Sequence, residues 1–175
     1  NLIRAVDEVV SDLMRKILHH KEFLALESAW RGLYFLARRI ETESDLKIYL
    51  FDISKDQLAA NLKSINSLHD SVYYQWAAGE KLENSTGEPW AVVCGNYDFS
   101  PNVDDVAALI RIGEISATAN TPFISHIRPD ILGVASLSEN RNSSNWQLSE
   151  ESTEHKLWTT LRDQKESEYL GMAMP

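Results

Sequence analysis

The stretch Glu88–Arg128, EPWAVVCGNYDFSPNVDDVAALIRIGEISATANTPFISHIR, has the pattern of one strand–helix–strand unit. It begins with the apolar run WAVVC at residues 90–94, which is too short and too rich in β-branched residues for a helix. Gly95-Asn96, a typical turn pair, follows this run directly. We therefore predict a buried strand that ends at Gly95-Asn96.

A helix is predicted over Val103–Ala119. Ser100-Pro101-Asn102 offers an N-cap side chain and a proline at a first-turn position, and Asp104 and Asp105 lie where the helix dipole favours negative charge. After this turn the only charged residues of the segment are Arg111 and Glu114, so the helix should be covered on most of its sides. Its expected inner stripe is Val106, Ala107, Ile110, Gly113 and Ala117, widened by Leu109, Ile112 and Ile115.

Asn120-Thr121-Pro122 ends this helix, and residues 123–127, FISHI, predict a second short strand. A strand–helix–strand crossover normally joins parallel neighbours, with its helix on one face of the sheet. A further interior strand is predicted over Asp45–Ile53, because both of its alternating sets of side chains are largely apolar. The fold class is therefore α/β: a crossover core with a mixed sheet, flanked by N-terminal amphipathic helices.

Two amphipathic helices are predicted before this core, over residues 2–18 and from Phe23 to about Glu41. Apolar residues recur in both at spacings of three and four. The residues of these stripes that we single out are Ile3, Val6, Val10, Leu13 and Ile17 in the first helix, and Trp30 and Leu33 in the second. The stripes are suited to a helical hairpin, to the sheet of the same chain, or to another chain. Gly32 in mid-helix suggests that another backbone approaches closely there.

Three shorter helices complete the expected order of elements. Ser54-Lys55-Asp56-Gln57 is a capping-box pattern that begins one helix, a second is expected at about 70–78, and a third at about 150–165. We divide the chain into an N-terminal helical region, residues 1–44, and an α/β domain, residues 45–175. Because the chain starts without methionine and stops as an apolar stretch begins, we expect it to be part of a longer polypeptide.

Composition excludes several classes of function. The 175 residues are 43% hydrophobic and include 17 basic against 26 acidic residues, a net charge of −9, so a basic patch for nucleic acid or anionic lipid is not expected. No apolar run approaches the roughly 18 residues of a membrane span. The single cysteine, Cys94, has no internal partner for a disulfide, which suits a reducing compartment.

Local motifs for catalysis or cofactor binding are absent from the sequence, including phosphate-binding glycine loops, the GxSxG elbow and HExxH. His19-His20 with Glu22 has the residue types of a metal site, but adjacent helical side chains diverge by about 100°, so no metal site is predicted. Asp104-Asp105 is better explained by helix capping than by acid–base chemistry. No catalytic residue and no cofactor are predicted from these motifs.

One polar position remains as a candidate ligand site. Asp98 follows the first crossover strand, at the edge where open α/β sheets bind ligands, although a tight turn explains it equally well. Cys94 and His126 lie on the two crossover strands and form a possible nucleophile pair, but we expect Cys94 to be a small buried hydrophobic residue. The rival function is a small-molecule-binding or hydrolytic α/β domain that uses Asp98, His126 and Cys94 in one pocket.

Five stretches, in order along nearly the whole chain, resemble one known family. They are ILHHKEFLALESAWRGL at 17–33, GEPW at 87–90 leading to GNYDF at 95–99, DDV at 104–106, ANTPFI at 119–124, and Trp158 with residues 162–175, which end in YLGMAMP. This set is similar to the large subunit of the type VI secretion contractile sheath, the TssC/VipB-type (EvpB) family. Where that family usually has Gly-Asp-Tyr, this chain has Gly95-Asn96-Tyr97.

The resemblance implies a structural protein without catalysis or cofactor. Members of the family pair with a small sheath subunit, and the heterodimers stack into a cytoplasmic tube around an inner tube protein, which contraction propels. The seven stripe residues named above are then expected to meet the small subunit or a neighbouring sheath subunit, with closure of the chain's own core as the alternative. A sheath protein of a related contractile injection or phage-tail system is a further alternative.

Overall fold

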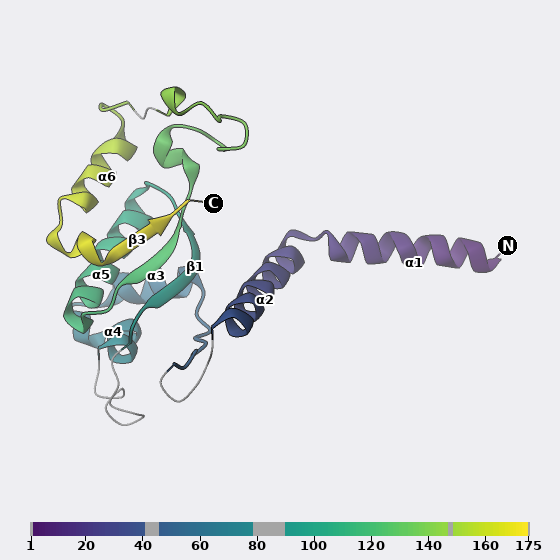
Figure 1. Cartoon of the computed structure of the whole chain (residues 1–175), viewed down its shortest axis with the longest axis horizontal. Coiled ribbons are helices and arrows are strands. Elements are labelled where there is room, and N and C mark those ends of the chain that lie inside the picture. The colour runs from purple at the N-terminus through teal and green to yellow at the C-terminus, as the bar shows by residue number, and fades with distance from the viewer. Residues whose placement is uncertain (1, 41–45, 79–89, 147–148, 175) are drawn as a thin grey trace. The chain divides into compact units, whose positions relative to one another are not determined.

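The computed structural model of the chain describes residues 2–40, 46–78, 90–146 and 149–174. These residues form two compact units, residues 1–52 and residues 53–175 (Figure 1). The domain boundary predicted from the sequence, between residues 44 and 45, lies outside the described residues, as does the predicted end of the second helix at Glu41.

The first unit contains the two predicted amphipathic helices. They are α1 (Leu2–Leu18) and α2 (Lys21–Arg39), separated by His19 and His20. The chain leaves α2 at Ile40, which has an extended backbone and whose N–H still donates to Leu36 O. The three-and-four spacing of apolar residues therefore predicted both helices correctly.

The second unit is an α/β arrangement built on three strands (Figure 1). In chain order its elements are α3 (Lys55–Ser64), η1 (Leu68–Asp70), α4 (Val72–Ala77), β1 (Val93–Phe99), α5 (Val103–Ala119), β2 (Phe123–Ile127), η2 (Pro129–Leu132), η3 (Ser143–Asn145), α6 (Thr153–Arg162), η4 (Lys165–Tyr169) and β3 (Leu170–Ala173). The strands lie in the order β1-β2-β3, and both pairings are parallel. The α/β class is confirmed, whereas the predicted mixed sheet is not confirmed among the described strands.

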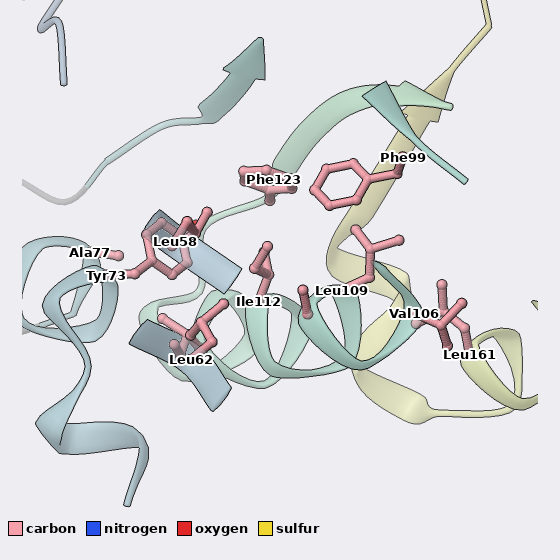
Figure 2. Close-up of a cluster of buried hydrophobic side chains, with 12 residues drawn as sticks. Leu58, Leu62, Tyr73, Ala77, Phe99, Val106, Leu109, Ile112, Phe123 and Leu161 are labelled. Atoms are coloured by element: carbon pink, nitrogen blue, oxygen red, sulfur yellow. The ribbon is translucent and has the colours of Figure 1, made fainter. Parts of the chain in front are cut away.

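Helix α5 is the centre of the core. Its N-cap Asn102 accepts from Asp105 N, and its C-cap Asn120 takes the left-handed conformation, so local signals set both ends. One side of the sheet packs on it: Phe99 and Phe123 lie over Leu109 and Ile112 in Figure 2, and all four are at most 1% exposed. Helix α5 also contacts α3, α4, α6 and η4.

The buried positions of α5 confirm that it is covered on most sides but correct the predicted stripe. Ala107 is exposed, and Ile110 and Ala117 are only half-buried. The buried residues are Asp105, Val106, Ala108, Leu109, Ile112, Gly113, Ile115 and Ser116. The sheet and the flanking helices approach this helix from different directions, which is why the buried surface is wider than one stripe and rotated from the predicted one.

Strand β1 starts three residues later than predicted and continues through Gly95 and Asn96 to Phe99. Gly95 does not end the strand. A Cβ at this position would lie 2.6 Å from Phe123 Cζ, so the glycine makes room for the aromatic ring on β2. The register with β2 shifts between Cys94 and Asp98, and the buried Ser125 hydroxyl lies 2.8 Å from Gly95 O and 2.9 Å from the O of Tyr97.

The predicted interior strand at 45–53 is wrong for the described part of that segment. Residues 46–53 have no strand assignment, and Leu46, Ile48 and Leu50 are 42%, 39% and 70% exposed. An apolar alternation marks a strand only where neighbouring strands pair with it, and the described sheet consists of β1, β2 and β3. Conversely, β3 was not predicted, although its four residues pair with β2 over their whole length.

Candidate subunit interface

The rival ligand-site hypothesis uses three residues, Cys94, Asp98 and His126, and all three lie on the outward face of the sheet. We define this face by its exposed residues, which are Cys94, Asn96 and Asp98 of β1 and Ile124 and His126 of β2. Asp98 and His126 are register partners, with His126 Nδ1 3.7 Å from Asp98 Oδ1, and both side chains are at least half exposed. The two residues therefore lie together on an open surface.

Cys94 is exposed, so the prediction of a small buried hydrophobic residue is wrong. The strand continues past Gly95, and the alternation of its side chains turns Cys94 outward. Partial burial nevertheless raises the pKa of the Cys94 thiol, which disfavours the nucleophilic thiolate. The three described strands also have no topological switch point, the usual place for a ligand crevice, because successive parallel strands add in one direction.

The acidic residues at the start of α5 are part of a structural cluster. Asp105 Oδ2 accepts from Ser100 N at 2.8 Å and from Lys55 Nζ at 2.7 Å, and the same Lys55 Nζ donates to Asp98 O. The ammonium of Lys55 also lies 4.8 Å from the ring centre of Phe99. This cluster connects the first residue of α3 to the end of β1 and the start of α5. The sequence analysis predicted a capping role for Asp105 and did not point to Lys55.

The possible metal corner at the junction of α1 and α2 is open to solvent. His20 Nδ1 lies 4.0 Å from Glu22 Oε2, and these side chains are 63% and 92% exposed. Among the described residues, no group of three or more His, Cys, Asp or Glu side chains is placed to hold a metal ion. Within the same part of the chain, no helix combines the length and the apolar character that a membrane span requires.

The apolar stripe of α1, which is Ile3, Val6, Val10, Leu13 and Ile17, lies on the surface. These side chains are between 46% and 78% exposed, and no residue of α1 is buried. Arg15 and Asp12 form an ion pair of 2.8 Å on the other side of the helix. The described structure therefore brings the five predicted residues together on one face and leaves that face uncovered.

Helix α2 also presents large side chains to solvent. Trp30 is 58% exposed, whereas Leu33 is half-buried. Tyr34 and Phe35 are more than half exposed, and each lies under an arginine four residues later: Arg38 is 5.6 Å from the Tyr34 ring centre, and Arg39 is 4.7 Å from that of Phe35. The sequence analysis did not single out these two pairs, although their i,i+4 spacing was visible.

Gly32 lies between these aromatic residues, and the expectation that another backbone approaches closely there is wrong for the described residues. A Cβ built at this position meets no atom within 4 Å, so no other described part of this chain approaches the helix there. The aromatic and arginine side chains around it are of the types enriched at protein–protein interfaces. The two exposed helices therefore have the composition of a docking surface.

Exposed apolar helices of this kind are typical of proteins that assemble with other chains, and comparison with known sequences gives the family. Residues 1–175 match the family VipB (EvpB/VC_A0108, tail sheath N-terminal domain), so the chain belongs to this family. It is also 33% identical over 177 residues to the type VI secretion system sheath protein TssC1 of Pseudomonas aeruginosa. That match covers 100% of this chain and 36% of the relative, so the chain spans about a third of the relative's length.

Proposed function

We propose that this protein is a structural component of a type VI secretion contractile sheath. In this proposal it pairs with a small sheath subunit, the heterodimers stack with neighbouring sheath subunits around an inner tube protein, and the tube lies in the cytoplasm. Its role is mechanical, with no catalysis and no cofactor. Family membership over the whole chain and the sheath name of the relative support the proposal.

The observation that carries the proposal is the exposed apolar surface of α1 and α2. Burial of an aliphatic side chain of this size stabilises by roughly 1.5–3 kcal/mol, yet no residue of either helix is buried. Uncovered surface of this kind marks a site of protein–protein interaction. We propose that residues 1–44 act as a docking region, that residues 45–175 form the sheath domain, and that the interface includes Ile3, Val6, Val10, Leu13, Ile17, Trp30 and Leu33.

The test is co-expression of the full-length protein with the small sheath subunit encoded beside it, followed by measurement of solution mass and electron microscopy. The proposal expects a heterodimer or hollow tubes that form only on co-expression. A monodisperse monomer that ignores this subunit would contradict it.

A double variant tests the surface itself. Val10→Asp with Leu13→Asp adds two negative charges to the apolar stripe and should abolish co-purification while the isolated chain keeps its melting temperature. Ala5→Asp with Ser11→Asp adds the same charge to the polar side of α1 and should leave co-purification intact. If the first variant lowered the melting temperature of the isolated chain, the stripe would belong to the chain's own core.

A further inference from the structure

Strand β3 is the outermost strand at one side of the described sheet (Figure 1). Its four residues pair with β2, which is their only strand neighbour in the described part of the chain. Because successive residues of a strand direct their N–H and C=O groups to opposite sides, alternate groups of β3 point away from β2. Among the described residues, residues 171–173 make no backbone hydrogen bond outside the pairing with β2. The side of β3 that faces away from β2 is therefore a free edge.

The sequence of β3 lacks the features that protect a natural sheet edge. Such edges carry charged side chains, proline or a bulge, which hinder pairing with a further strand. Residues 169–174, YLGMAM, contain no charge and no proline, and β3 pairs with β2 in unbroken register. Ala173 is exposed, and Met174 is 43% exposed. An apolar and regular edge of this kind is a template for another strand.

The opposite edge of the sheet, β1, has these protective features. Its register with β2 shifts between Cys94 and Asp98, as at a bulge. The backbone oxygen of Asp98 accepts from Lys55 Nζ at 2.7 Å. The outward side chains of this strand include the polar Asn96 and Asp98. The contrast between the two edges indicates that a further strand adds at β3 rather than at β1.

Burial on the inner face of the sheet is also less complete at β3. The inward side chains of β2, which are Phe123, Ser125 and Ile127, are at most 3% exposed. On β3 their register neighbours Leu170 and Met172 pack against the same core but are only half-buried. A further strand along the free edge would cover these two apolar side chains. The core therefore lacks a neighbour on the same side as the backbone does.

The family and its length indicate which segment covers the free edge. The matched family model describes an N-terminal domain, and the match to the relative TssC1 covers 36% of that protein. In a full-length member, further chain therefore follows β3, the last described element. The strands add to the sheet in chain order, and consecutive strands are neighbours roughly two-thirds of the time. This order favours the next segment of the same polypeptide.

A second molecule is a weaker candidate for the same edge. Pairing the β3 edges of two copies would join strands of only four residues, a small contact against the roughly 1,000 Å² that a specific interface buries. A segment of the same polypeptide needs only the entropy of closing a loop, which grows slowly with loop length. The covalent connection therefore favours the following segment over another chain.

We propose that, in the full-length protein, a strand from the segment after residue 175 pairs with the free edge of β3 and extends the sheet. This inference goes beyond the proposed function, because it rests on the sheet and the family and not on sheath assembly. The α/β unit and the C-terminal part of the protein then share one sheet and move as one rigid body.

Hydrogen exchange of single amides in the full-length protein tests the proposal. In an edge strand every second amide is unpaired and exchanges fast, whereas in an interior strand all amides are protected. We expect residues 171–173 to be protected as strongly as residues 124–126 of β2, which serve as the interior reference. Alternating protection in β3 would show that β3 remains the edge of the sheet and would overturn the proposal.

Photo-crosslinking identifies the chain that supplies the strand. Benzoylphenylalanine is placed at Ala173, the exposed register partner of His126, or at Asn96 on β1 as the matched control. Isotope-labelled and unlabelled full-length protein are mixed, with and without the small sheath subunit. Position 173 should crosslink to a segment beyond residue 175 of the same molecule, and position 96 should not.

The other crosslinking outcomes contradict the proposal. Crosslinks from position 173 that stay within residues 1–175, or that reach a second copy or the small subunit, would assign the edge differently. A crosslink from position 96 to the same C-terminal segment would place that segment across the outward face instead of along β3. None of these outcomes depends on whether the two subunits co-purify, which is the test of the proposed function.

Discussion

Helices α1 and α5 have the same length, 17 residues, and opposite surroundings. Eight residues of α5 are buried against the sheet and the helices of its unit, whereas none of α1 is buried. The sequence pattern predicted both helices, and it predicted an apolar face for each. The comparison shows that an apolar stripe specifies burial but does not say whether the covering surface comes from the same chain.

The largest difference is expected from truncating one leucine in each helix. Leu109 of α5 is 0% exposed, so Leu109→Ala should cost about 3 kcal/mol of unfolding free energy through lost transfer energy and a residual cavity. Leu13→Ala in α1 should change it by less than about 0.5 kcal/mol, since Leu13 is 56% exposed. Urea unfolding of the 175-residue chain measures both. Equal costs would show that α1 packs in the chain's own core.

A tyrosine of the core should make stability fall at alkaline pH. Burial raises the pKa of Tyr73 to about 12, from 10.0 in the unfolded chain. The folded state therefore holds this proton more tightly, and its contribution is complete below pH 10 and lost as the pH rises towards 12. At roughly 1.4 kcal/mol for each pKa unit, the total contribution is at most about 3 kcal/mol. The free energy of unfolding of the wild type, measured at several pH values, should fall over this range. Tyr73→Phe should remove this fall, whereas Tyr34→Phe in the exposed α2 should not.

The ion pairs of the two helices give a third contrast. Asp105 of α5 is 11% exposed and pairs with Lys55, whereas Asp12 of α1 is 68% exposed and pairs with Arg15. Asp105→Ala removes the side-chain acceptor of Ser100 N and leaves Lys55 Nζ with only Asp98 O, so it should cost about 2 kcal/mol. Asp12→Ala should cost less than about 0.5 kcal/mol. Thermal melting reports both changes. A neutral Asp105→Ala would mean that the cluster does not stabilise the fold.

The smallest effects are expected at two glycines, with opposite signs. Gly32→Ala in α2 adds a methyl group to open space and should stabilise that helix by about 1 kcal/mol, seen as slower amide exchange. At Gly113 of α5 the new Cβ would lie 3.3 Å from Glu166 O, a backbone atom, so overpacking should outweigh the gain in propensity and leave a net loss of about 1 kcal/mol. If the two alanine substitutions changed stability in the same direction, the proposed difference between the surroundings of the two glycines would be contradicted.

The elements with local signals were predicted best. The predicted helix at 103–119 and the strand at 123–127 coincide with α5 and β2, because Asn102 and Asn120 are caps that act within a few residues. The errors have distant causes. Gly95 resembles a turn residue but makes room for Phe123, 28 positions later, and β3 exists because β2 offers it a pairing edge.

The sequence predicted which residues share one face in the candidate site, but it did not predict whether that face is exposed. The five residues of the α1 stripe were identified from spacing alone, and the structure shows that they are exposed. Sequence reasoning missed Tyr34 with Arg38 because it considered the apolar stripe of this helix and not its i,i+4 pairs. It missed Lys55 because the partner of a buried carboxylate, 50 positions away, carries no sequence signal.

Amide hydrogen exchange of α1 tests the central claim most directly, measured in the full-length protein alone and in its complex with the small sheath subunit. We expect the amides of α1 to exchange far faster than those of α5 in the protein alone, and to become strongly protected in the complex. If the amides of α1 were as protected as those of α5 without the subunit, the stripe would already be covered by the protein itself, and the account would be wrong.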